Sequence, residues 1–334
     1  MKGRNMRQQS PIEISSKVFS RQQLRRELCV AFWFLLLLTV ATLGKAQTMD
    51  SPMRIAVGPP GEILVSDSVQ DKVIALDTST LAEDWSFDVQ GTPMAVAYAS
   101  NLVFIGNATT HNVEVYRLQG TPNGPGVTLN FVCNLGLTAP GTTGTIRIPS
   151  DIDIDKDSGL VFVVDSGERK VKVFDTAGDT VSELPSSTDE PLLSPTAITV
   201  DTTRQEVLVS DYGDPNGSFK ANVPARIMIY SYSGTFLAKI DGGASDTNAQ
   251  FDRPQGLDTD GRGHIFMAES LKGQIFVFDR TTGALVQKLS SFGNQPGQLE
   301  LPLDLVIDKK TGNLFVTNNM LKRIEVFPAA GGLQ

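Results

Sequence analysis

Short runs of alternating apolar and small residues recur along the chain from about residue 53 onward. The runs are rich in β-branched and aromatic side chains and are bounded by Gly, Asn or Asp, which is typical of β-strands. No helical periodicity interrupts them. One set of six runs, most of which end in Asp or Asn, occupies residues 62–67, 102–107, 160–165, 206–211, 264–269 and 314–318. A second set lies at 72–77, 112–117, 170–175, 226–231, 274–279 and 323–327.

The spacing of these runs indicates a repeat. The ends of the first set are separated by 40, 58, 46, 58 and 49 residues. Repeats of this length with about four strands each are typical of propeller blades. Fourth strands are expected at 83–89, 127–135, 180–184, 234–240 and 283–289. The sequence therefore predicts an all-β fold: a six-bladed β-propeller over residues 47–334, with four antiparallel strands per blade.

The sixth repeat differs from the others because only three strands are visible before the chain reads PAAGGLQ at 328–334. A propeller normally closes with a strand that comes from the other end of the chain. Two outcomes remain open: Gln47–Pro52 pairs with the sixth blade, or the outer edge of that blade stays open.

Three repeats carry a specific resemblance. They read IPSDIDIDKDSGLVFVVDSGERKVKVFD (148–175), AQFDRPQGLDTDGRGHIFMAESLKGQIFVFD (249–279) and FGNQPGQLELPLDLVIDKKTGNLFVTNNMLKRIEVF (292–327). This pattern resembles the NHL-repeat family of six-bladed propellers, of the exported bacterial type. The resemblance covers nearly all of residues 53–327 and implies a fold more strongly than a function.

The first 46 residues have a different character from the repeats. Arg25 and Arg26 precede an uncharged apolar run from Leu28 to Leu43, and Gly44-Lys45-Ala46 follows. This order is typical of a secretory signal that is cut after Ala46. An uncleaved signal anchor is the alternative, and it would be the only contact with a membrane. Both interpretations predict an exported protein, which is periplasmic, secreted or anchored and facing outside.

Charge limits the partners of the repeat region. The whole chain has a net charge of −8, but residues 1–46 hold eight basic and two acidic residues, so the remainder has a net charge of −14. A body this acidic repels nucleic acid, and we expect no nucleic-acid partner. We expect the protein to be a monomer.

Acidic residues recur at two positions of the first strand of the blades, two and four residues after its Pro. They are Asp151, Asp153, Asp258 and Asp304. First strands line the central channel of a propeller, so these carboxylates could hold a hard cation such as calcium or pair with Arg54, which occupies the same position in blade 1. Separate solvation by channel water is the third possibility.

The residue that ends each second strand is Asp67, Asn107, Asp165, Asp211, Glu269 or Asn318. A ring of ligands on one face is one interpretation. The structural interpretation is a side chain that accepts backbone N–H groups of its own turn.

The longest insertion, residues 212–225, lies between the second and third strands of blade 4. Function is often carried by loops on a rigid scaffold, so Tyr212, Asp214, Asn216 and Phe219 are the candidates for partner binding. Aromatic Tyr212 and Phe219 would be anchors, with Asp214 at the rim. Alternatively, Phe219 packs back onto its own blade.

Few residues are available for catalysis. The chain has two His and two Cys residues, and Cys133 is the only thiol in the repeat region. The related peptide-amidating lyases bind zinc through three histidines, so that activity is excluded. Gluconolactonase- and paraoxonase-like hydrolases hold calcium in the channel, and a calcium-dependent hydrolase of this type is the alternative function.

The favoured function is a non-catalytic binding scaffold without a cofactor, which recognises a protein or glycan outside the cytoplasm.

Overall fold

The computed structural model describes residues 49–121, 126–136, 144–175, 177–187, 190–218, 222–243 and 247–328. Contacts divide the chain into two units, Met1–Gly44 and Lys45–Gln334, and every described residue belongs to the second. Among these residues, no helix has the length and apolarity needed to cross a membrane. The signal or anchor segment predicted for 1–46 and the candidate Phe219 lie outside the described residues.

The described strands form six antiparallel sheets, one per blade, which follow one another in sequence. Blades 1 and 2 comprise β1 (Pro52–Val57), β2 (Glu62–Asp67), β3 (Lys72–Asp77), β4 (Glu83–Asp88), β5 (Pro93–Ala99), β6 (Leu102–Asn107), β7 (Asn112–Gln119) and β8 (Thr128–Leu135). Blades 3 and 4 comprise β9 (Pro149–Ile154), β10 (Val161–Asp165), β11 (Lys170–Phe174), β12 (Thr180–Leu184), β13 (Pro195–Asp201), β14 (Glu206–Asp211), β15 (Arg226–Ser231) and β16 (Phe236–Asp241). Blades 5 and 6 comprise β17 (Pro254–Thr259), β18 (His264–Glu269), β19 (Gln274–Asp279), β20 (Leu285–Leu289), β21 (Pro302–Ile307), β22 (Leu314–Asn318) and β23 (Arg323–Phe327).

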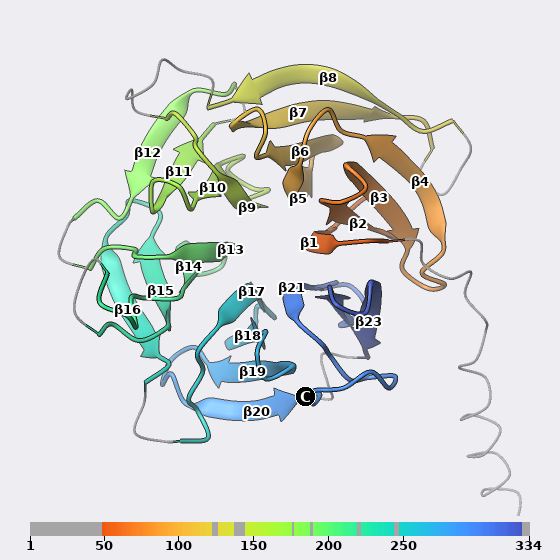
Figure 1. Ribbon diagram of the computed structural model, residues 1–334. Helices are drawn as coiled ribbons and strands as arrows, with labels where there is room; N and C mark the ends of the chain where they lie inside the picture. The colour runs from red at the N-terminus through yellow and green to blue at the C-terminus, as the bar shows by residue number, and fades with distance from the viewer. Residues whose placement is uncertain are drawn as a thin grey trace, which may run out of the picture. The chain divides into compact units, whose positions relative to one another are not determined.

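The six sheets stand around a central axis, with the first strand of each blade innermost (Figure 1). Each inner strand contacts the inner strand of the next blade, and β21 contacts β1, which closes the ring. The predicted six-bladed propeller is confirmed. Five sheets have four strands, and the described part of blade 6 has three, as the sequence of the sixth repeat indicated. The predicted strand positions agree with the observed ones to within about two residues.

The core consists of six apolar clusters, each between two neighbouring blades. Successive side chains of a strand point to opposite faces of its sheet, so one strand contributes to two clusters. In β18, Phe266 packs between blades 5 and 6, whereas Ile265 and Met267 pack between blades 4 and 5. This alternation makes every blade depend on both neighbours.

The residue that ends each second strand holds its turn and the loop leading into its blade. Asp67 accepts hydrogen bonds from the backbone N–H groups of Val69 and Gln70 in its own turn, and from those of Asp50 and Ser51 in the lead-in. Asp165, Asp211 and Glu269 repeat the pattern. The structural interpretation of this column is confirmed.

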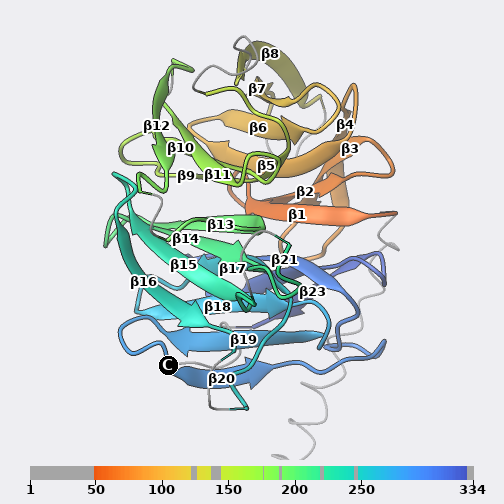
Figure 2. The same cartoon turned by 60° about the vertical axis from the view of Figure 1, so that its left-hand side comes forward.

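Strand direction alternates within each blade, so the connections gather on two faces of the disc, which Figure 2 shows turned toward its edge. We call one the insertion face. It carries the turns between second and third strands, including 212–225, and the loops that lead into each inner strand. The opposite face carries the remaining turns, such as 58–61 and 308–313.

The inner strands of blades 5 and 6 lie close together at Gly256. A Cβ added there would collide with the carboxylate and the Cα of Asp304. We expect Gly256→Ala to lower the free energy of unfolding by about 2–3 kcal/mol through overpacking. Its control, Ala197→Gly at the same position of blade 4, should cost about 1 kcal/mol. Urea unfolding measures both, and equal losses would contradict the close approach.

Candidate functional site: the central channel and the insertion face

The inner strands leave one backbone edge unpaired toward the channel, because each pairs with only one strand of its own blade. Aspartates of the neighbouring blade accept hydrogen bonds from this edge. The carboxylate of Asp151 (blade 3) accepts from the N–H of Ile198 (blade 4) at 2.9 Å, and that of Asp304 (blade 6) accepts from Ile55 (blade 1) at 2.9 Å. Since a buried unpaired N–H is costly, these contacts join blades through backbone groups that would otherwise be unsatisfied.

A second pair of aspartates does the same two residues further along the strands. Asp153 accepts from the N–H of Val200 at 2.7 Å, and Asp258 accepts from the N–H of Ile307 at 2.8 Å. All four acids predicted to line the channel therefore link one blade to the next. Sequence reasoning placed them in the channel, but it did not reveal this shared role.

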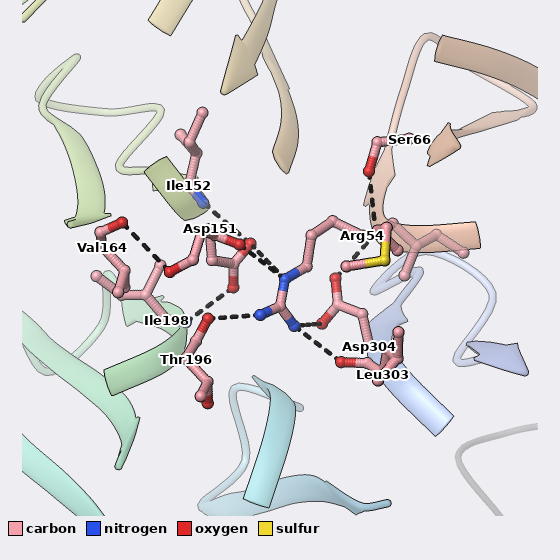
Figure 3. Close-up of polar contacts among 12 residues, drawn as sticks. Arg54, Ser66, Asp151, Ile152, Val164, Thr196, Ile198, Leu303 and Asp304 are labelled. Carbon is pink, nitrogen blue, oxygen red and sulfur yellow. Dashed lines mark hydrogen bonds and ion pairs between the residues drawn. The ribbon is translucent and has the colours of Figure 1, made fainter. Parts of the chain in front are cut away.

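Arg54 crosses the channel from blade 1 and fills its centre (Figure 3). Its guanidinium donates hydrogen bonds to the backbone carbonyls of Ser150 at 3.0 Å, Thr196 at 2.5 Å and Leu303 at 2.8 Å. These carbonyls belong to blades 3, 4 and 6. The side chain is only 6% exposed, so the channel is closed at this level by a buried cation.

The guanidinium also forms ion pairs with two of the buried carboxylates. Nε lies 3.7 Å from Asp151, and Nη1 lies 3.8 Å from Asp304. Burial raises the pKa of Asp304 well above its usual range, the charge of Asp151 adds to this rise, and Arg54 opposes it. The predicted alternative in which the channel acids pair with Arg54 is confirmed for Asp151 and Asp304.

The other two carboxylates face one hydroxyl group. Thr199 Oγ1 lies 3.3 Å from Oδ2 of Asp153 and 3.3 Å from Oδ1 of Asp258. A single hydroxyl proton can be donated to only one of them at a time. Burial, with a contribution from the charge of Asp258, raises the pKa of Asp153 to about 6. Lys309 opposes the shift at both carboxyls.

A cavity of about 410 Å³ opens from this second layer onto the opposite face. Its inner wall includes Asp153, Thr199 and Asp258, and its outer part includes the lysines Lys156, Lys309 and Lys310. The cavity thus has an acidic interior and a basic mouth, on the side of the disc away from the insertion.

The four aspartates do not converge on one point, because they occupy two levels of the channel. Within the described ranges, no group of three or more His, Cys, Asp or Glu side chains is arranged to hold a metal ion. A calcium ion in the channel stays a prediction. Asp151 and Asp304 already have Arg54 as their counter-charge, so Asp153 and Asp258 at the cavity wall are the remaining candidate ligands.

On the insertion face, Tyr212 lies against the loop that leads into blade 5. Its hydroxyl accepts hydrogen bonds from Arg253 and from Gln255, and the guanidinium carbon of Arg253 lies 5.4 Å from the ring centroid. The ring also borders a hollow of about 440 Å³ with Arg169 and Ser194. Tyr212 is therefore held in place and half-buried, with one side on an open hollow.

The other candidates of the insertion have different environments. Asp214 was expected at an exposed rim, but it is 5% exposed, because its carboxylate accepts the Ser218 N–H at 2.7 Å and its backbone pairs with Val223. The predicted rim position of Asp214 is therefore wrong: the buried side chain stabilises the loop by its hydrogen bond to Ser218. Asn216 is exposed at the tip. Partner binding by these residues stays a prediction.

Sequence reasoning missed a set of exposed apolar side chains on the same face. Val69, Leu271 and Met320 lie in turns between second and third strands, and Ile148 and Phe292 lie in lead-in loops, with exposed fractions of 40–66%. The remaining exposed large apolar residues of the described chain lie on outer strands, and none lies in a turn of the opposite face. The signal in the sequence was an apolar residue inside a polar turn.

Comparison with known proteins supports the fold alone. No protein-family model matches the chain, and no curated protein matches its sequence. Among solved structures it is similar to the Kuenenia stuttgartiensis hydrazine synthase, with a TM-score of 0.58 and 14% sequence identity over 87% of this chain and 80% of that one.

Loss of the channel cation should destabilise the fold. Arg54→Met leaves Asp151 and Asp304 buried without their counter-charge, and we expect the free energy of unfolding to fall by about 3–5 kcal/mol at pH 7. The loss should be smaller at pH 4, where the carboxyls can take up protons. The exposed pair Lys72–Asp88 provides the control, since Lys72→Met should cost no more than about 1 kcal/mol. Equal effects of the two substitutions in urea unfolding would refute the role of Arg54.

The raised pKa of Asp153 predicts a pH dependence. The folded protein holds this proton up to about pH 6, whereas the unfolded chain loses it near 3.8, so this group's contribution to stability is lost as pH rises from about 4 to about 6. Asp258→Asn removes the facing negative charge and should reduce that loss by about 1–2 kcal/mol. The control is Asp157→Asn at the exposed mouth. Urea unfolding from pH 4 to pH 7 measures the difference, and parallel curves for wild type and Asp258→Asn would contradict the coupling.

Proposed function

We propose that this protein is an extracytoplasmic, non-catalytic binding propeller of the NHL-repeat type, which recognises a protein partner with its insertion face. One observation carries the proposal: every exposed large apolar side chain in the described turns and loops lies on that face. Exposed apolar groups that gather on one face are characteristic of interaction sites.

Four of these residues follow consecutive blades, and we call them the apolar arc: Leu271 in blade 5, Phe292 in the loop into blade 6, Met320 in blade 6 and Val69 in blade 1. Their exposed fractions are 56%, 63%, 62% and 66%. The segments that carry them are in contact. A Cβ added to Gly273, near Leu271, would lie 2.9 Å from the Cα of Phe292, and Asn319, next to Met320, donates a hydrogen bond to Ser51 of the lead-in to blade 1.

The rest of the insertion face fits the same role. Its turns are held by the hydrogen bonds of Asp67, Asp211 and Glu269, so little conformational entropy is lost when a partner binds. The net charge of −14 on the repeat region favours a neutral or basic partner surface. The hollow beside Tyr212 is where a glycan would bind if the partner carries one, since an aromatic ring and hydroxyl groups border it.

Polar substitution within the apolar arc should weaken partner binding and leave the fold intact. We expect Phe292→Ser with Met320→Ser to weaken binding about 30-fold or more, because central apolar contacts are worth about 2 kcal/mol or more each. Thermal unfolding should hardly change, since both side chains are more than half exposed.

The measurement is quantitative capture of partners by a tagged, exported copy, followed by titration of the recovered partner. Phe131→Ser on the outer strand β8 is the matched control, because Phe131 is 57% exposed but lies outside both faces. Tyr212→Ala tests the hollow separately. Unchanged affinity of the Phe292/Met320 variant, with reduced affinity of the Phe131 variant, would show that the outer rim is the binding surface.

A further inference from the structure

The cavity on the opposite face has a polar side and an apolar side. The fifth residue of every inner strand borders it. Blades 3, 4 and 5 supply the polar side, and blades 6, 1 and 2 supply the apolar side. In that order the six residues are Asp153, Thr199, Asp258, Val306, Ala56 and Ala97. Because each set of three blades is consecutive around the ring, the two sides face each other across the channel (Figure 1).

The polar side presents three oxygen acceptors close to one another. Thr199 Oγ1 lies 3.3 Å from a carboxylate oxygen of Asp153 and 3.3 Å from one of Asp258. Each carboxylate also accepts two backbone N–H groups, which hold it in place. Unlike the aspartates beside Arg54, neither carboxylate has an ion-pair partner among the described residues. The polar side therefore combines a fixed geometry with negative charge that no cation contacts directly.

The mouth of the cavity carries the opposite charge. Lys156 lies in the turn after the inner strand of blade 3, and Lys309 and Lys310 lie in the corresponding turn of blade 6. All three side chains are exposed, and none forms an ion pair within the part of the chain that the structure describes. Asp157 and Asp308 also border the mouth, so the lysines outnumber the acids there by three to two.

We propose that this cavity binds a small aliphatic amine that carries a carboxylate at its other end. An ammonium group donates three hydrogen bonds, which match the two carboxylates and the hydroxyl of Thr199. The methylene groups of the ligand pack against Val306, Ala56 and Ala97, and its carboxylate lies among the lysines of the mouth. The cavity volume of about 410 Å³ is within the range of small-molecule sites.

An ammonium group fits the polar side better than a calcium ion. Calcium takes about six to eight oxygen ligands, whereas this side offers two carboxylates and one hydroxyl. A positive charge between Asp153 and Asp258 also relieves the repulsion between them. The site lies on the face away from the apolar arc, so the proposal does not depend on partner binding by the insertion face, and each can fail without the other.

Calorimetric titration of the whole exported protein with three aminoalkanoates tests the proposal. The probes are γ-aminobutyrate, δ-aminovalerate and ε-aminocaproate, which differ in the number of methylene groups between the two charges. We expect at least one to bind with a Kd of about 1 mM or below. Caproate lacks the ammonium group and hexylamine lacks the carboxylate, so both should bind about tenfold more weakly than the best aminoalkanoate.

Substitutions at the two ends of the site should have different effects. Asp258→Asn should weaken binding of the aminoalkanoate and of hexylamine about tenfold and should not weaken that of caproate. Lys309→Met should weaken the aminoalkanoate about threefold or more and leave hexylamine unchanged. The controls Asp88→Asn and Lys72→Met remove the same charges from an exposed pair outside the cavity and should change neither affinity.

Thr199→Val is a second test of the polar side, because it keeps the shape of the side chain and removes only the hydroxyl group. Three results would overturn the proposal: no binding of any aminoalkanoate at about 10 mM, equal affinity for ε-aminocaproate and caproate, or an affinity unaffected by both Asp258→Asn and Thr199→Val. Calcium binding that is lost in Asp258→Asn, without binding of any amine, would assign the two acids to the metal instead.

Discussion

The free backbone edges of the inner strands are the constraint on which the channel is built. Each inner strand can pair with only one strand of its own blade, so a row of N–H and C=O groups faces the axis. In this protein the acceptors come from aspartates of the preceding blade, and Arg54 supplies donors to three carbonyl groups. The same contacts provide hydrogen-bond partners for the free backbone groups and join the blades to one another. The polar side chains of the channel therefore have a structural role.

Arg54 divides the channel because of its position in β1. As the third residue of that strand it lies at the level of Asp151 and Asp304, nearer the insertion face, and the next level has no basic side chain. Asp153 and Asp258 therefore face a cavity, and their repulsion is relieved by the proton that Asp153 retains to about pH 6. The single side chain of Arg54 thus closes the channel at the level of Asp151 and Asp304, while the level of Asp153 and Asp258 borders the cavity.

The two faces of the disc differ for a related reason. Six apolar clusters between blades carry the stability, and the second-strand Asp, Asn and Glu residues hold the turns of the insertion face from below. Side chains at the tips of these turns are consequently free to vary without cost to the core. Apolar side chains at such tips, such as those of Phe292 and Met320, are more than half exposed and therefore contribute little to the stability of the fold. Their clustering on one face therefore favours a role in recognition.

The number of blades, the strand positions and the inward column of aspartates can be predicted from the sequence, because strand alternation and turn residues are local properties that repeat. Which of these residues contact one another depends on how the blades pack. Arg54 reaches carbonyls 96, 142 and 249 residues away, and no local pattern encodes those distances. The burial of Asp214 depends on a turn that closes onto Val223, and the position of Met49 depends on the ring bringing blade 1 beside blade 6. Alternation fixes which way a side chain points, but only closure of the ring fixes what it meets.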